Sequence, residues 1–344
     1  MYYRIRLYVY LDSIIANYDR LSKVKYLREG IMTSLKPSDD NVYGGKWSLE
    51  KLNCIESYLR AFLAVMRKQD WADLWYIDAF CGSGIQRFPK KDDGMGLFDG
   101  YDLDMVSFTE GSAFRAIKLT SEFEQEGSRG FDHFVFVEKD PSKLEELKEL
   151  LLSNFPSQIE KCSFELGDVN ERLPETLRRT PWYQNGRGVT FIDPCAMQMK
   201  WSTLQCFSQT LSDVWLLLPI EAMRRVLAKE SMPTGALART LDEFFGSSDW
   251  RSLYLDSAEN QLSLFDDLNE RALRREEGDR AIVAYAETRL NLIFSKVLEP
   301  AYPRKENGVA KFLLYPLISN HNKRAIEVAS RIAMDLVSKI NRGC

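Results

Sequence analysis

The chain has 344 residues, of which 45% are hydrophobic and 12% aromatic, so it is long enough to bury a large core. Its formal net charge of −4 and its pI of about 5.6 exclude a uniformly basic nucleic-acid-binding surface, although they allow a local basic groove. The six cysteines form no C-x-x-C pair and there are only two histidines, so no zinc site, other metal site or disulfide framework is expected.

The cysteine usage and the apolar runs also bear on the compartment. Free thiols fit a reducing environment. No apolar run is long enough to span a bilayer, and the N-terminus lacks the core of a signal peptide. The sequence therefore predicts a cytoplasmic protein.

The first quarter of the chain divides into an arm, a helix and a strand. Residues 1–46 read as an N-terminal arm and linker that ends in the turn-forming segment 37–45. Ser48 is a plausible N-cap for a helix that presents one apolar face up to residue 66. Residues 74–80 follow as an apolar run without polar alternation, which is typical of a buried parallel strand.

A Gly-Ser-Gly turn at 82–84 ends this strand, and residues 85–109 are rich in Gly, Asp and Lys. This composition predicts a surface insertion that acts as a mobile flap. A helix is then expected from Ser112 to about residue 125.

Further strands are predicted at 133–138, 163–166, 188–192 and 214–218, and they alternate with helical segments. Asp140-Pro141 is a strong helix start because aspartate caps the helix and proline fits its first turn. Residues 220–278 read as a helical insertion, anchored by apolar side chains at Phe244, Phe245 and Trp250.

The C-terminal part is predicted to hold a helix at 279–294, a hairpin and a final helix at 323–340. Asn307-Gly308, between the apolar stretches 296–303 and 310–319, is a hairpin turn signal. The predicted fold is therefore α/β: a doubly wound, mostly parallel, seven-stranded Rossmann-like sheet with an antiparallel C-terminal hairpin and helical additions. Five parallel strands followed by such a hairpin is the topology of the class I S-adenosylmethionine (SAM)-dependent methyltransferases, and residues 47–344 are assigned to that domain.

Each of the first four strands carries an acid at or just after its carboxyl end: Asp78, Glu138, Asp168 and Asp193. Ligands of open α/β sheets bind beyond the carboxyl ends of the strands, where the strand order reverses. Glycines after the first strand let a ligand approach the main chain closely. These positions predict a cofactor site along one edge of the sheet.

The order and spacing of several motifs resemble the three-Cys-motif partner protein (TcmP) family. The motifs are KWSLEKL at 46–52, YIDAFCGSG at 76–84, FVE at 136–138, GDVN at 167–170 and FIDP at 191–194, with Trp201. The resemblance covers the chain from about Trp47 to the final helix. It implies a methyltransferase-like fold and a partner protein with a three-cysteine motif.

By resemblance to class I methyltransferases, the cofactor is SAM. The glycine loop is then expected against its amino-acid part, with Asp78 fixing the loop or the ammonium group. Glu138 is expected to accept hydrogen bonds from both ribose hydroxyls, and Asp168 to bind the adenine amino group unless it is only a helix cap. The expected cofactor-binding residues are Asp78, Phe80, Gly82, Gly84, Glu138, Asp168 and Val169.

The expected catalytic residues are Asp193, Pro194 and Cys195. Enzymes that methylate exocyclic amines of bases carry Asp/Asn-Pro-Pro-aromatic at this strand end, where the first side chain accepts the amine protons. Here Cys195 and Ala196 replace the second proline and the aromatic residue. Pro-Cys resembles the cytosine-5 methyltransferases instead, whose cysteine attacks the ring, but the Glu-Asn-Val motif of that chemistry is not found. A thiol that only fills a turn is the remaining interpretation.

Two functions follow from these residues. The first is a SAM-dependent methyltransferase that acts on nucleic acid, with Asp193 orienting the acceptor; three arginine pairs would contact phosphates unless they are solvated helix faces, namely 178–179, 224–225 and 274–275. The second is a catalytically inactive methyltransferase-like module that binds a partner protein.

Overall fold

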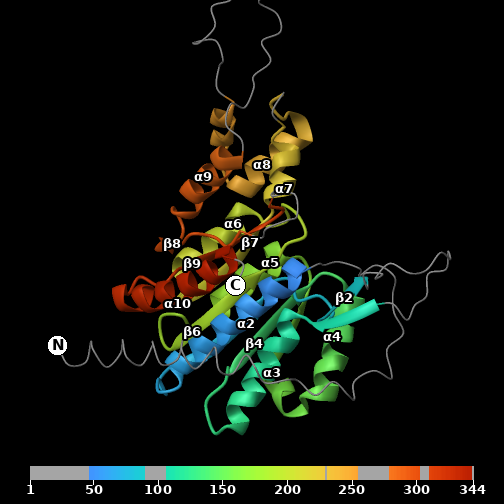
Figure 1. Ribbon diagram of the computed structural model, residues 1–344, viewed down its shortest axis with the longest axis vertical. Coiled ribbons are helices and arrows are strands. Elements are labelled where there is room, and N and C mark those ends of the chain that lie inside the picture. The colour runs from blue at the N-terminus through green and yellow to red at the C-terminus, as the bar shows by residue number, and fades with distance from the viewer. Residues whose placement is uncertain (1–45, 90–105, 229–230, 255–278, 303–309, 343–344) are drawn as a thin grey trace, which may run out of the picture.

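A seven-stranded sheet forms the centre of the computed structural model, which describes residues 46–89, 106–228, 231–254, 279–302 and 310–342 (Figure 1). In spatial order its strands are β5 (Cys162–Leu166), β4 (His133–Glu138), β1 (Asp73–Asp78), β6 (Gly186–Ile192), β7 (Ser212–Leu218), β9 (Leu313–Ile318) and β8 (Lys296–Val297). The first five run parallel, and β9 is antiparallel to β7 and β8. Numbered along the chain within this sheet, the order is 3-2-1-4-5-7-6, so the predicted class I methyltransferase-like fold is confirmed.

Both faces of the sheet are covered by helices, as the apolar strands require. One face carries α2 (Lys46–Met66), α3 (Ser112–Gln125), α4 (Pro141–Asn154) and α10 (Lys323–Arg342). The other carries α5 (Val169–Arg179), α6 (Trp201–Gln205), α7 (Ile220–Val226), α8 (Gly235–Phe245) and α9 (Asp279–Leu290). Figure 1 shows α2, α3 and α10 crossing the front of the sheet, while α7, α8 and α9 gather at one end of the molecule. Short 3₁₀ helices occur at Pro156–Lys161, Cys206–Gln209 and Asp249–Leu253.

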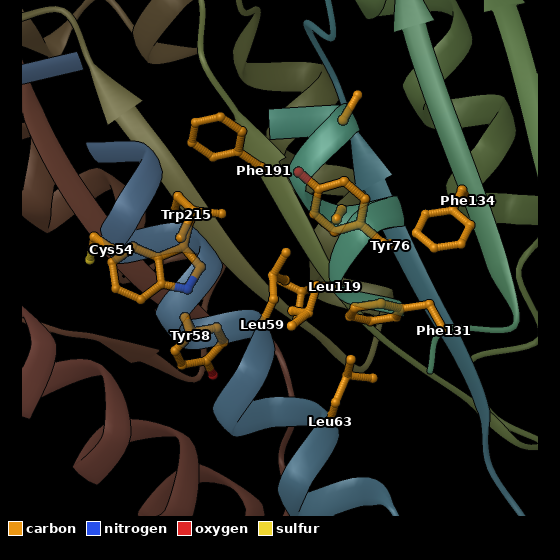
Figure 2. Packing of buried hydrophobic residues seen from close by; sticks show 14 of the residues in the cluster. Cys54, Tyr58, Leu59, Leu63, Tyr76, Leu119, Phe131, Phe134, Phe191 and Trp215 are labelled. Carbon is orange, nitrogen blue, oxygen red and sulfur yellow. The ribbon is translucent and has the colours of Figure 1, made fainter. Parts of the chain in front are cut away.

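Helix α2 is fastened across the sheet by large buried side chains. Figure 2 shows Tyr58, Leu59 and Leu63 of α2 beside Tyr76 of β1 and Trp215 of β7. The rings of Tyr58 and Trp215 lie 5.0 Å apart in an edge-to-face arrangement. This packing fixes the position of the preceding turns of α2, including residue 51.

Two predicted helix boundaries are wrong. Ser48 is not an N-cap but lies inside α2, whose described residues start at Lys46. Helix α9 ends at Leu290, and turns replace its expected last residues to 294. Within the segment 85–109, β2 (Ile85–Pro89) and β3 (Val106–Glu110) pair as an antiparallel hairpin; residues 90–105 lie outside the described part, and the mobile flap stays a prediction.

Other predictions fall partly on residues outside the description. This holds for the N-terminal arm, the Asn307-Gly308 turn and much of the insertion at 220–278. Within the insertion, the expected anchors Phe244, Phe245 and Trp250 are buried. Among the helices that are described, none is both long and apolar enough to cross a membrane.

Candidate functional site

The four predicted acids lie at the carboxyl ends of adjacent parallel strands, in the spatial order β5, β4, β1, β6. Asp78 is the last residue of β1 and Glu138 the last residue of β4. Asp168 and Asp193 follow β5 and β6 directly. The strand order reverses around β1, so the acids flank the position where such sheets bind ligands.

The two glycines after β1 are required for different structural reasons. Both have positive φ angles, +58° at Gly82 and +77° at Gly84. A Cβ on Gly84 would lie 2.6 Å from Cδ1 of Leu147, and the Gly84 carbonyl accepts a hydrogen bond from the Gly111 N–H at 2.7 Å. A Cβ on Gly82 would meet no such heavy atom within 4 Å. Gly84 therefore allows close packing against α4, whereas Gly82 leaves the main chain open to a ligand.

Asp78 is fully buried behind this loop. Its carboxylate accepts hydrogen bonds from the Phe80 N–H at 3.3 Å and the Tyr76 hydroxyl at 3.2 Å. Burial raises the pKa of Asp78 to about 7, and the nearby charge of Asp193 also raises it. A cationic ligand group beside Asp78 would stabilise its ionised form, which fits the predicted role with an ammonium group.

Glu138 ties the glycine loop to the end of β4. One carboxylate oxygen accepts the Gly82 N–H at 3.1 Å, and the other accepts the N–H groups of Lys139 and Asp140 at 2.8 and 2.9 Å. A carboxylate has about four acceptor positions, so one remains for a ribose hydroxyl rather than two. Glu138 thus orients the loop in addition to its predicted role in cofactor binding.

Asp168 caps α5. Its side chain accepts hydrogen bonds from the backbone N–H and the side-chain amide of Asn170, at 2.8 and 2.9 Å. The hydrogen bond from the Asn170 backbone is the main reason that the pKa of Asp168 is lowered. Val169 is buried and Phe80 is half-buried in the same apolar cluster. The binding of adenine by Asp168 and Val169 stays a prediction.

Asp193, at the end of β6, forms an ion pair with Lys51 of α2, a residue that sequence reasoning missed. The side chains of Lys51 and Asp193 are only 7% and 20% exposed. The Lys51 ammonium also lies 5.9 Å from the centre of the Phe191 ring. One signal could have found it: Lys51 precedes Ile55 by four residues and Tyr58 by seven, which places a lysine on the buried face of α2.

Cys195 is exposed two residues further on. Desolvation of its sulfur raises the pKa of the Cys195 thiol, and the negative charge of Asp193 raises it further. A raised pKa lowers the thiolate population and so disfavours a nucleophilic cysteine. The geometry favours the interpretation of Cys195 as a residue of the turn.

An apolar cavity of about 20 Å³ lies beside this turn, between the end of β7 and helices α6, α8 and α9. Its lining includes Pro194, Trp201, Phe244 and Arg289. Such a volume holds about one water, so the cavity is no pocket for a base in this conformation. Trp201 is buried, and the Arg289 guanidinium lies 4.7 Å from its ring.

One arginine of each described basic pair is engaged with a carboxylate of the protein. Arg179 pairs with Glu165 at 2.7 Å, and Arg224 pairs with Asp279 at 3.2 Å. The pair 274–275 lies outside the described residues. These contacts favour ordinary surface ion pairs over phosphate contacts.

Neither a protein-family model nor a curated protein matches the sequence. Similar solved structures include a Legionella pneumophila protein of family model DUF519, with 14% identity and a TM-score of 0.45 over 85% of this chain and 93% of that chain. Trm1 from Pyrococcus horikoshii, in complex with S-adenosyl-L-methionine, shows 12% identity and a TM-score of 0.36 over 90% and 80%. A SAM-dependent methyltransferase from Clostridium acetobutylicum shows 10% identity and a TM-score of 0.31 over 77% and 91%. These likenesses are weak, so the fold assignment rests on the strand order of the sheet.

Proposed function

We propose that this chain is a SAM-dependent methyltransferase of the TcmP type that transfers a methyl group to a nitrogen acceptor of a nucleic acid. The observation that carries the proposal is the loop after β1. Its Gly82 has an open left-handed backbone, its N–H is held by Glu138 at 3.1 Å, and the buried Asp78 lies behind it. This cradle stands at the strand-order reversal of a class I methyltransferase-like sheet.

The residues present fit SAM. Asp78 and Glu138 supply negative charge for a cofactor that carries an ammonium and a sulfonium group, and Gly82 lets it approach the backbone. When bound, SAM supplies an electrophilic methyl group. Asp193 would accept an N–H of the acceptor and so turn the nitrogen lone pair toward that methyl group. A partner protein with a three-cysteine motif and a cytoplasmic location complete the proposal.

Calorimetry of SAM binding to the full chain tests the proposal. We expect micromolar affinity for wild type and a loss of about tenfold or more, or about 1.4 kcal/mol, for Gly82→Ala. The matched control is Gly127→Ala, because Gly127 also has a positive φ angle, +70°, and open space around its Cβ position. No binding of SAM at millimolar concentration, or equal loss in both variants, would contradict the proposal.

The small cavity beside Pro194 favours a second candidate, an inactive module that binds a partner protein. The cavity that the described residues form there has a volume of about 20 Å³, which is too small for a base. SAM binding without methyl transfer to DNA, RNA or the partner would support this candidate.

A further inference from the structure

The ion pair between Lys51 and Asp193 joins two parts of the chain that are 142 residues apart. It places a buried cation next to the carboxylate that the proposed function assigns to the acceptor. Lys51 is 5% exposed as a residue, and its ammonium group lies near the Phe191 ring of β6. Lys51 lies in the KWSLEKL motif but is not among the residues expected to bind the cofactor or the acceptor. No function for its buried charge therefore follows from the sequence motifs.

The charges around this point are unevenly distributed. The charge of Asp193 is close enough to Asp78 to raise the pKa of Asp78, and the charges that act on the Cys195 thiol are those of Asp193, Lys143, Glu138 and Lys51. Of Asp78 and Asp193, only Asp193 has an ion pair in the contacts described. A cation of the cofactor would therefore stabilise the ionised form of Asp78, while the charge of Asp193 is already compensated.

A compensated carboxylate discriminates between acceptors. An uncharged amine needs only a hydrogen-bond acceptor, which the second oxygen of Asp193 supplies. An alkyl ammonium group at the same place would meet the like charge of Lys51 in a region of low solvent exposure, where charge interactions are strong. It would also find the attraction of Asp193 largely cancelled.

We propose that Lys51 is a specificity-determining residue that makes the acceptor side selective for an uncharged aromatic amine, such as the exocyclic amine of a nucleobase, over an alkyl ammonium group. This inference rests on the proposed function and names the chemical class of its acceptor. Lys51 acts through Asp193 and through its own charge, and it leaves the cofactor cradle unchanged.

Two cofactor analogues measure this selectivity without a known acceptor. S-adenosylhomocysteine has an uncharged thioether sulfur in place of the methylated sulfonium of SAM, whereas sinefungin carries an ammonium group at the position of the methyl group. The ratio of their dissociation constants reports how well the site tolerates a cation at the transfer position. We expect Lys51→Met to shift this ratio in favour of sinefungin by about tenfold or more, the size of one pK unit of charge interaction.

Two variants control for loss of packing, and two more test the charge pairing. Lys51→Arg keeps the charge and should keep the wild-type ratio. Arg60→Met removes another part-buried cation of α2, which pairs with Glu122 at 2.9 Å, and should also keep it. Asp193→Asn leaves Lys51 uncompensated and should shift the ratio against sinefungin, while Lys51→Met combined with Asp193→Asn should restore it. If Lys51→Met alone does not fold, Asp193→Asn and the double variant still test the inference.

Each remaining outcome decides against the inference. Equal weakening of both ligands in Lys51→Met would mean that Lys51 contacts a part that they share. An unchanged ratio with a lower free energy of unfolding would make the ion pair a purely structural link between α2 and β6. Failure of wild type to bind either ligand would overturn the proposed function itself, and the inference with it.

Discussion

The two halves of the candidate site are built in different ways. The cofactor side, formed by Asp78, Gly82, Gly84 and Glu138, is held by backbone hydrogen bonds at the ends of β1 and β4. The acceptor side, formed by Asp193, Pro194 and Cys195, depends on a lysine from a distant helix and on apolar packing under α8 and α9. The first half is a property of neighbouring strand ends, and the second exists only once α2, α6 and α8 have docked.

The largest expected effect concerns the packing that supports the acceptor side. Gly246 ends α8 with a φ angle of +63°, and a Cβ there would lie 1.9 Å from Cδ1 of the buried Trp201. We expect Gly246→Ala to lower the free energy of unfolding, measured with urea, by about 2–4 kcal/mol, since overpacking adds to left-handed strain. Gly127→Ala carries only the strain and should cost about 1 kcal/mol. Similar losses in both variants would mean that the ring of Trp201 moves aside freely.

On the cofactor side, Glu138→Ala removes the acceptor of three backbone N–H groups and the predicted partner of the ribose. We expect SAM binding to weaken by about 100-fold, or about 2.7 kcal/mol, because a charged hydrogen-bonding group is lost from a preorganised loop. Calorimetry measures this loss of SAM affinity. The control is Glu165→Ala, which removes a surface partner of Arg179 and should leave the affinity unchanged. If Glu138→Ala binds SAM as wild type does, the cofactor side is misplaced.

The pH dependence of SAM affinity distinguishes the cofactor side from the acceptor side. Because the pKa of Asp78 is raised to about 7, a cationic ligand beside it must first displace a proton at lower pH. SAM affinity should therefore rise with pH up to about 7 and fall by up to about tenfold per unit below it. Proton release, measured as different binding enthalpies in buffers of different ionisation enthalpy, checks the same point. A pH-independent affinity would exclude a cation at Asp78.

Asp213 of β7 supplies the control for this pH dependence. Its pKa is also raised to about 7 by burial, and its carboxylate accepts a hydrogen bond from the Tyr58 hydroxyl at 2.8 Å. A raised pKa means that the folded protein holds a proton that the unfolded chain releases, so this group's contribution to stability is lost as the pH rises from about 4 through about 7. Asp213→Asn should flatten the stability profile there and leave the pH dependence of SAM binding unchanged.

The smallest effect is expected at Cys195. Its thiol has a raised pKa and no described hydrogen bond to a base, so Cys195→Ser should change SAM affinity less than about twofold, which is less than about 0.4 kcal/mol. An oligonucleotide that contains 5-fluorocytosine should form no adduct that survives denaturation. A stable adduct would restore the cytosine-5 mechanism and make Cys195 the nucleophile.

The sequence alone predicted the sheet and the cofactor side. Short apolar runs such as 133–138 that alternate with helices are typical of buried strands of a parallel sheet, and an acid at the end of each such strand lies at one edge of that sheet. Gly82 and Glu138 lie within a few residues of their strand ends. Local patterns therefore carry enough information to bring them together.

Only the tertiary structure decided the roles of residues whose partners are distant in the chain. Gly84 packs on Leu147, and Lys51 reaches Asp193 because α2 lies across the sheet. A lysine on an apolar helix face shows that a partner must exist, since a buried charge is costly without one. It does not show which of the acids that partner is. That choice depends on the position at which the side chains of α2 pack against β1 and β7, which no local sequence pattern records.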